Sequence, residues 1–176
     1  MTSLKRSLKN MQIRRYNPGE EEEIWEIVSQ ATRISNARDY HPDLINRWAP
    51  KNKDMDEWAD RMKQQSPFVA IIDSQIVGMA ELESNGFIDY FYVHPDFQGR
   101  GVGKALLKHI ESEVSGMLVD CLFCDVSLTA RPFFESQSFV VTEARQNIIL
   151  GHSAPNFAME KHLSEQGSAH QSTTAP

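Results

Sequence analysis

The first third of the chain alternates between a short strand and helical spacing of apolar residues. Met11–Tyr16 is typical of a strand. Asn17, Pro18 and Glu20 then predict a helix start, with Asn17 as the N-cap and Pro18 at the first helical position. The predicted helix carries an apolar stripe made of Ile24, Ile27, Val28 and Ala31. Two further helices are predicted, over Pro42–Trp48 and Asp54–Gln64.

From Pro67 onward the pattern changes to strands. Phe68–Ile72 and Ile76–Ala80 are apolar runs separated by Asp73, Ser74 and Gln75, which is a hairpin signal. A third run covers Gly86–His94. The three runs predict an antiparallel meander.

The last part of the chain returns to mixed elements. Apolar residues at helical spacing predict a helix over about Gly101–Ser115. After it we expect a strand at Val119–Val126, a short helix at Arg131–Gln137, and closing strands at Phe139–Glu143 and Ala158–Lys161. The predicted fold class is α/β (α+β): a mixed, mostly antiparallel twisted sheet with flanking helices and one strand–helix–strand crossover. Residues 1–163 form the expected single domain, and residues 164–176 a disordered polar tail.

Composition narrows the classes of partner. A chain of 176 residues suits one domain, and its net charge of −6 argues against a nucleic-acid partner. No run reaches the roughly 18 apolar residues of a membrane span, and Met1–Asn10 lacks a secretion signal, so we expect a cytoplasmic protein with no membrane partner. Cys121 and Cys124 are predicted to be buried packing thiols on opposite faces of a strand. The histidines show no metal-ligand spacing, and no metal is expected.

A glycine-rich loop lies between the third predicted strand and the long helix. It places three glycines in five positions, at Gly99, Gly101 and Gly103. Such a loop lets backbone N–H groups converge at a helix N-terminus, which suits a pyrophosphate. The dinucleotide fingerprint fails because position 104 is Lys, and the triphosphate loop fails because position 98 is Gln and Ala105 follows the lysine. A plain flexible turn is the alternative.

Longer stretches carry a resemblance to a known family. The segment Gln98–Gly103, preceded by Tyr92-Val-His-Pro95, resembles the Q/R-x-x-G-x-G/A signature of the GNAT (GCN5-related) N-acetyltransferase superfamily. Ser127–Phe139 is similar to that family's N-x-x-A-x-x-F-Y-E-x-x-G-F segment. Residues 39–58 and 156–161 resemble an uncharacterised bacterial branch of it. The resemblance spans about residues 11–162 and implies a GNAT-like acyl-CoA N-acyltransferase fold.

The resemblance also implies a cosubstrate and its site. Acetyl-CoA would have its pyrophosphate wrapped by the loop residues Gln98, Gly99, Arg100, Gly101, Val102, Gly103 and Lys104. Its pantetheine arm would pair with the main chain of Phe91, Tyr92 and Val93, and its thiol end would be lined by Ser127, Phe133 and Phe134. Tyr40 and Trp48 lie on the implied substrate-side helices, with core packing as the alternative for Trp48.

The sequence departs from the family where many relatives carry a proton-donating tyrosine. That position is Phe134, which cannot donate a proton. Ser127 likewise stands where many relatives have Asn. A thiolate needs little help to leave, because a thiol pKa is roughly 8.5. The proton could come from Ser127, from Cys124, Tyr90 or Tyr92, or from water.

For the general base the sequence favours Asp89. It is the one charged residue in the apolar and aromatic run 87–93, where desolvation would raise a carboxyl pKa. Strict alternation would put it on the same face as Phe91 and Val93, with two residues of strand spanning roughly 6.5 Å. The alternative is a structural ion pair of Asp89 with a cation such as Arg131 or Arg145. The reserve candidates are Glu81 and Glu83.

Together these features predict an N-acetyltransferase. It would move an acetyl group from acetyl-CoA to a primary amine of a small molecule or peptide, by direct attack in a ternary complex. The competing hypothesis is a non-catalytic acyl-CoA-binding sensor, suggested by Phe134. The oligomeric state, including a homodimer, is left open by the sequence.

Overall fold

The computed structural model describes residues 10–115 and 117–163, so the predicted tail at 164–176 lies outside the described residues. The described part forms one seven-stranded sheet in the order β1-β2-β3-β4-β5-β7-β6. The strands are β1 Gln12–Arg15, β2 Phe68–Ile72, β3 Gln75–Leu82, β4 Phe87–Val93, β5 Cys121–Ser127, β6 Val140–Ile149 and β7 His152–His162. Only the β4–β5 pair is parallel; the other five pairs are antiparallel. The predicted fold class is confirmed.

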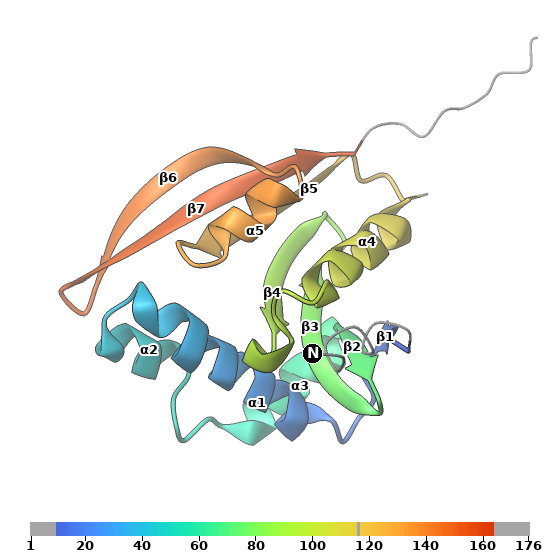
Figure 1. Cartoon of the computed structure of the whole chain (residues 1–176), viewed down its shortest axis with the longest axis horizontal. Coiled ribbons are helices and arrows are strands. Elements are labelled where there is room, and N and C mark those ends of the chain that lie inside the picture. Colours follow the sequence, from blue (N-terminus) through green and yellow to red (C-terminus); the bar gives the residue numbers. More distant parts are fainter. Residues whose placement is uncertain (1–9, 116, 164–176) are drawn as a thin grey trace, which may run out of the picture.

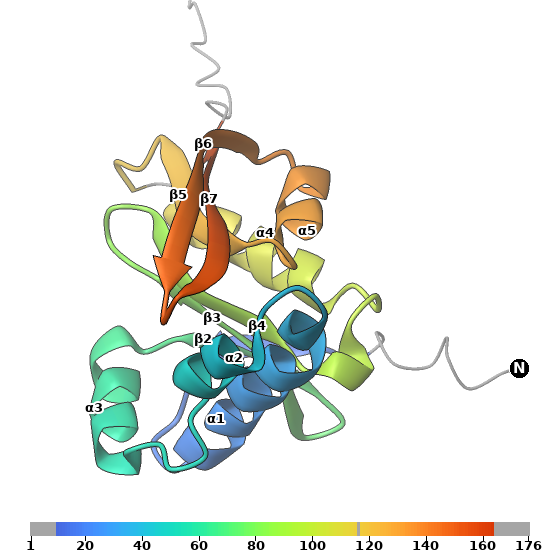
Figure 2. The same ribbon diagram turned by 90° about the vertical axis from the view of Figure 1, so that its left-hand side faces the viewer.

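Helices cover both faces of this sheet (Figures 1 and 2). They are α1 Glu21–Gln30, α2 Pro42–Trp48, α3 Met55–Gln65, α4 Val102–Val114 and α5 Arg131–Ser136, with a π-helical turn η1 Ala31–Ser35 and 3-10 turns η2 Asn36–Arg38 and η3 Pro95–Phe97. On one face α4 and α5 bury a core that includes Leu106, Ile110 and Phe134. On the other face α1 and α3 bury Ile24 and Trp58. None of the helices in the described ranges is long and apolar enough to cross a membrane.

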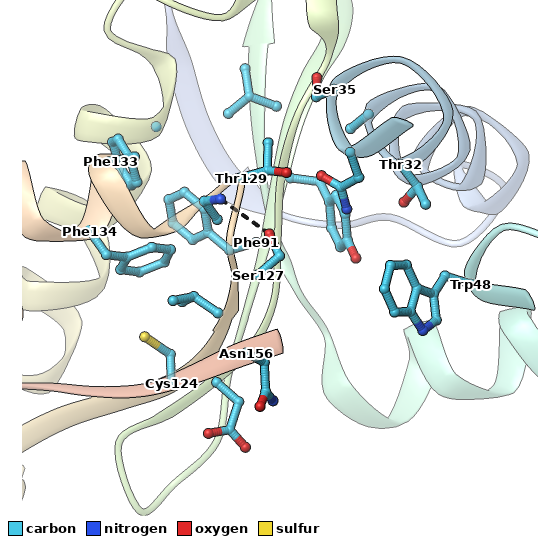
Figure 3. A pocket seen from close by; sticks show the side chains of 18 of the residues that line it. Thr32, Ser35, Trp48, Phe91, Cys124, Ser127, Thr129, Phe133, Phe134 and Asn156 are labelled. Carbon is cyan, nitrogen blue, oxygen red and sulfur yellow. Dashed lines mark hydrogen bonds between the residues drawn. The ribbon is translucent and has the colours of Figure 1, made fainter. Parts of the chain in front are cut away.

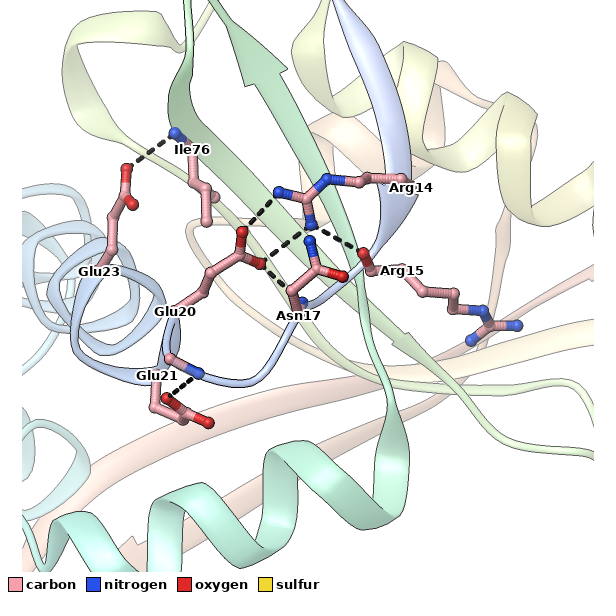
Figure 4. Close-up of polar contacts among 8 residues, drawn as sticks. Arg14, Arg15, Asn17, Glu20, Glu21, Glu23 and Ile76 are labelled. Atoms are coloured by element: carbon pink, nitrogen blue, oxygen red, sulfur yellow. Dashed lines mark hydrogen bonds and ion pairs between the residues drawn. The ribbon is translucent and has the colours of Figure 1, made fainter.

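The predicted asparagine cap of the first helix is wrong. Helix α1 begins at Glu21, so Asn17 lies outside it. Asn17 and Glu20, three residues apart, instead form a turn in which the Glu20 carboxylate accepts the Asn17 backbone N–H at 2.8 Å. Figure 4 shows the reason: the Glu20 carboxylate also binds the Arg14 guanidinium, which lowers the Glu20 pKa. Glu23 accepts the Ile76 backbone N–H at 2.8 Å. These carboxylates fasten the start of α1 to β1 and β3.

The closing strands are longer than the sequence predicted. The expected segments Phe139–Glu143 and Ala158–Lys161 belong to a continuous hairpin, β6–β7. Its turn uses left-handed backbone at Leu150 (φ 52°) and Gly151 (φ 78°). Most of β6 was not predicted because its residues are largely polar and do not alternate with apolar ones. This edge strand is exposed along much of its length, so it needs no apolar alternation.

Strand β4 contains a bulge that the alternation argument did not anticipate. Ala80 pairs with Phe91 and Leu82 with Ile88, so Asp89 and Tyr90 together oppose Glu81. A bulge of this kind shifts the side-chain alternation by one residue. Phe91 and Ile88 therefore both pack on the α4 side, whereas Tyr90 packs with the α1 and α3 residues. The expectation that Asp89 shares a face with Phe91 and Val93 is wrong, because its carboxylate contacts Arg61 of α3.

Arg61 holds two carboxylates at this bulge. Its Nε donates to Glu81 Oε1 at 3.1 Å and its Nη2 to Glu81 Oε2 at 2.5 Å, while Nη2 also contacts Asp89. Glu81 is 1% exposed and Asp89 is 38% exposed. Glu81, and not Asp89 as expected, is therefore the carboxylate removed from water. Its burial raises the Glu81 pKa, and the nearby Arg61 guanidinium opposes part of that rise. The ion pair that was the alternative role for Asp89 is therefore present, but its cation is Arg61. The two arginines named as examples, Arg131 and Arg145, bind other carboxylates.

The two cysteines differ in exposure. Cys124 is buried in the α4-side core with Leu122 and Val126, as predicted. Cys121 is only half-buried, so its prediction as a buried thiol is wrong. It lies at the first position of β5, where the strand emerges toward solvent.

We expect Arg61→Met to lower the free energy of unfolding by about 3 kcal/mol at neutral pH, because it leaves Glu81 buried without its cation. Burial raises the Glu81 pKa, so the folded state holds that proton more tightly than the unfolded chain does. Stability from this group is greatest at low pH and falls as pH rises through the raised pKa. The deficit of Arg61→Met should accordingly be smaller at pH 5 than at pH 8 in urea denaturation.

Two controls accompany this measurement. Arg61→Met combined with Glu81→Leu should regain most of the loss, because no unpaired buried charge remains. Arg38→Met, which breaks the exposed pair with Asp39, should change stability by less than about 1 kcal/mol. A double variant no more stable than Arg61→Met alone would contradict the explanation.

Candidate active site

The parallel strands β4 and β5 separate and leave a cleft of about 530 Å³ between them. They pair only at Phe87 with Phe123 and at Ile88 with Cys124. Beyond Ile88, β4 has no partner in β5, and the cleft is lined from both strands, from the turns after α1, and from α5 and the β6–β7 hairpin. Figure 3 shows Phe133 and Phe134 on one side of this space and Thr32 and Trp48 on the other.

The glycine loop joins the end of β4 to the start of α4. Gly99 (φ 71°) and Gly101 (φ 86°) have left-handed backbone, and Gly101 is the residue immediately before α4. The loop is braced by Gln98, whose amide Nε2 donates to Val93 O at 3.0 Å and to Ser35 Oγ at 2.9 Å. At Gly103 a Cβ would come within 3.1 Å of the Phe133 ring. The loop conformation therefore depends on glycine for both backbone and packing reasons.

Most of the predicted cofactor residues line this one cleft. They are Phe91, Tyr92, Val93, Gln98, Gly99, Gly103, Ser127, Phe133 and Phe134. The remaining loop residues do not line it. Val102 is buried in the core, Arg100 lies 5.1 Å from the Phe97 ring centre, and Lys104 borders a smaller hollow of about 290 Å³ between α4, α5 and β7.

An aromatic cluster forms the wall next to α5. The Phe91 ring centre lies 5.5 Å from that of Phe133 and 5.3 Å from that of Phe134. Phe134 is buried, and its ring also packs edge-on against Phe139. Phe134 therefore completes the core at this place, and a hydroxyl there is dispensable for packing.

The predicted proton donors differ in their access to the cleft. Tyr92 and Cys124 line it, and burial raises the pKa of each to about 12, so both stay protonated at neutral pH. Ser127 lines it too, and its Oγ accepts the Ala130 backbone N–H at 3.1 Å (Figure 3). Tyr90 is outside the lining and packs against Trp58.

The predicted base candidates also separate. Asp89 lines the cleft, whereas Glu81 and Glu83 do not. Glu81 is buried beneath Arg61, and Glu83 lies in the turn between β3 and β4. Asp125 on β5 is a second carboxylate in the lining that sequence reasoning missed, and it pairs with Arg145 at 2.8 Å.

The wall opposite the aromatic cluster is built from distant segments. The Tyr40 hydroxyl donates to Pro155 O at 2.7 Å and accepts the Leu128 N–H at 2.6 Å, and the Trp48 ring packs edge-on against Tyr40. Thr32 lies in the π-helical turn η1, and its Oγ1 is buried without a hydrogen-bond partner among the described residues. Sequence reasoning missed several lining residues here: Thr32, Ser35, Arg38, Ile149, Pro155 and Asn156. Neither a π-helical turn nor the return of the hairpin has a local sequence signal.

Comparisons with known proteins agree with this architecture. The family described as "Acetyltransferase (GNAT) domain" matches residues 36–149. The uncharacterised N-acetyltransferase YafP of Escherichia coli (strain K12) is 32% identical over 152 residues, which cover 86% of this chain and 96% of YafP.

Two solved structures extend the comparison. The GCN5-related N-acetyltransferase "Aminotransferase, Class-II" from Rhodopseudomonas palustris superposes with a TM-score of 0.80 at 29% identity, covering 86% of this chain and 95% of that one. YncA from Salmonella typhimurium, a putative acetyltransferase solved with its cofactor acetyl-CoA, has a TM-score of 0.67 at 19% identity, with coverage of 90% and 97%. The chain therefore belongs to the GNAT acetyltransferase family and is an acetyl-CoA-dependent N-acyltransferase.

Proposed function

We propose that this protein transfers the acetyl group of acetyl-CoA directly to a primary amine of a small molecule or peptide, with both substrates bound at once. The observation that carries the proposal is one continuous cleft whose lining holds loop residues Gln98 and Gly99 together with Asp89. The acetyl-CoA and the amine would meet at the place where β4 and β5 stop pairing, just beyond Ile88. A carboxylate and an anion-binding loop in one cleft are what such a transfer needs.

Direct attack is favoured over a covalent acetyl-enzyme. Cys124 is the cysteine in the lining, and burial raises its pKa to about 12, so almost none is present as the nucleophilic thiolate at neutral pH. Ser127 has no histidine among the described residues of the lining to activate it. The amine nitrogen would therefore attack the thioester carbonyl carbon itself. The C–N bond forms, the C–S bond breaks, and coenzyme A leaves as the thiolate.

The cosubstrate would be held by the loop and the unpaired edge of β4. The backbone N–H groups around Gly99 and Gly101, at the start of α4, are suited to the pyrophosphate. Main-chain groups of Phe91 to Val93 lack a β5 partner and would pair with the pantetheine arm, except for Val93 O, which already accepts a hydrogen bond from Gln98. The Phe133 and Phe134 rings would keep water from the thioester.

Asp89 is our proposed acceptor of the amine proton, either directly or through water. It is in the lining, and with Glu81 it gives the Arg61 cluster two carboxylates against one guanidinium. The excess negative charge would attract a protonated amine into the cleft. Glu81 is buried and outside the lining, so its role would be to hold Arg61.

The departing thiolate can take its proton without a family-type tyrosine. A thiol pKa near roughly 8.5 makes this thiolate a good leaving group. The hydroxyls of Ser127 and Tyr92 and the thiol of Cys124, all in the lining, are the available donors. The alternative, a sensor that binds acyl-CoA without turnover, shares the loop and would leave Asp89 only its ion pair with Arg61. Release of free coenzyme A, followed with DTNB across polyamines, aminoglycosides, amino acids and peptides, separates the two.

Acetyl-CoA should stabilise the protein against heat. At 100 times its dissociation constant, a ligand that binds only the folded state adds roughly 2.7 kcal/mol. A thermal melt recorded with increasing acetyl-CoA should rise in midpoint accordingly. An unchanged midpoint at saturating acetyl-CoA would contradict both the enzyme and the sensor.

Gly101→Ala should weaken coenzyme A binding at least about tenfold, or 1.4 kcal/mol. Its φ of 86° disfavours any side chain by roughly 1–2 kcal/mol, and relaxation of that strain would turn the loop amides away from the pyrophosphate. Gly19→Ala is the matched control, with φ 102° and open space around its Cβ in the turn before α1. It should cost similar stability and leave affinity unchanged in calorimetric titration. Equal affinities for the two variants would identify the loop as a plain turn.

Asp89→Asn should lower the turnover number at least about a hundredfold while acetyl-CoA affinity is retained, because asparagine keeps the shape but not the basicity. The loss should shrink at high pH, where the amine is already neutral. Asp125→Asn is the control, since Asp125 is also an arginine-paired carboxylate in the lining. Asp89 is not the base if its variant keeps wild-type turnover across the pH range.

A further inference from the structure

Two histidines and an aspartate meet outside the proposed catalytic centre. His41 and Asp43 come from the start of α2, and His152 is the first residue of β7. His152 Nε2 lies 3.1 Å from Asp43 Oδ2, and His41 Nδ1 lies 3.6 Å from the same oxygen. The two imidazole rings are stacked, with centres 3.5 Å apart and planes 11° apart. One nitrogen of each ring and a carboxylate oxygen all lie within 4.8 Å of one another.

This arrangement suits a metal ion. Ligand atoms at about 2.0–2.2 Å from one ion lie roughly 3.0–3.5 Å from each other, which is close to the separations observed here. To bind one ion, the two imidazole rings would turn out of their stack so that both lone pairs point at it. Two imidazoles and a carboxylate are ligands of zinc and neighbouring late transition metals, whereas magnesium prefers oxygen ligands alone. All three side chains reach solvent, so an ion can enter and water can complete its shell.

The base of the cluster is held by packing. Beneath it, Leu44 and Ile45 of α2 pack with Ala154 of β7, and Trp48 and Ile149 pack against them. The Tyr40 hydroxyl hydrogen bond to Pro155 O adds a second tie between the same segments. Figures 1 and 2 show α2 beside the tip of the β6–β7 hairpin. The backbone positions of His41, Asp43 and His152 are therefore held in place by the packing beneath them.

We propose that His41, Asp43 and His152 form a binding site for a divalent late transition-metal cation such as Zn²⁺. The ion would cross-link α2 to the β6–β7 hairpin. Both segments contribute to the cleft, through Trp48 on one side and Ile149, Pro155 and Asn156 on the other. The site thus fixes the wall opposite the aromatic cluster, and the proposal stands whether or not the catalytic roles above are correct.

A second group of residues provides the alternative to exclude. Cys121, Glu160 and His162 also have ligand atoms within 4.8 Å of one another, at the far end of β7. None of these three residues lines the cleft. This group offers sulfur, whereas the proposed site offers only nitrogen and oxygen.

The first test is calorimetric titration of the full chain with Zn²⁺ after treatment with a chelator. One equivalent should bind at the proposed site. His152→Gln, Asp43→Asn and His41→Asn should each weaken it at least about tenfold. Asparagine at position 41 is a favoured N-cap, so it replaces the His41 ring as acceptor of the Asp43 N–H and leaves α2 intact. His109→Gln, a histidine remote from both groups, is the matched control and should bind as wild type does.

Two further readouts make the result decisive. Zn²⁺ should raise the melting temperature of the wild type and of Cys121→Ser, but not of His152→Gln. Co²⁺ should bind without the intense near-ultraviolet charge-transfer band of a thiolate ligand. The proposal is overturned if the wild type binds no Zn²⁺, if the three site variants keep wild-type affinity, or if a thiolate band appears that Cys121→Ser removes.

Discussion

The bulge in β4 is the constraint on which the rest of the site depends. With Asp89 and Tyr90 opposite Glu81, the strand bends away from β5 after only two paired positions. The same extra residue leaves the main chain of Phe91 to Val93 without a β5 partner and turns Asp89 toward α3. The cleft, the unpaired edge of β4 and the position of the Asp89 carboxylate are thus all explained by the same bulge.

Arg61 stabilises this irregular place from the helix layer. The buried Glu81 would be unfavourable alone, and the guanidinium gives both of its oxygens a charged partner. The guanidinium carbon lies 4.4 Å from the Tyr90 ring centre, so the second bulge residue is held as well. Because Arg61 also contacts Asp89, the fold and the chemistry proposed for the cleft are joined through one side chain. A variant that changes only one of Arg61, Glu81 and Asp89 should therefore alter both the stability of the fold and the proposed chemistry. Only a variant that keeps the charges of this group balanced should affect one without the other.

The two walls of the cleft are built in different ways. The wall proposed to bind coenzyme A comes from one continuous stretch, β4 through the loop into α4, with α5 packed against it. The opposite wall is assembled from the turns after α1, from α2 and from the β6–β7 hairpin, which touch through Tyr40 and through the pair of Asp43 and His152. The loop touches this opposite wall through the hydrogen bond of Gln98 to Ser35, whereas α2 and the hairpin are joined to each other by contacts outside the loop. That division is consistent with a shared cosubstrate and a variable acceptor.

The sequence alone determined the sheet order of the meander, the long helix after the glycine loop and the family, because strand and helix periods and loop spacing are local. Nine of the residues that the family resemblance assigned to the cofactor line one cleft in the structure. It failed at the cap of α1, the face of Asp89 and the length of β6. Asp89 meets Arg61 across 28 positions and His152 meets Asp43 across 109. Such contacts depend on where a strand's register slips and which distant segments become neighbours, and only the packed tertiary structure decides that.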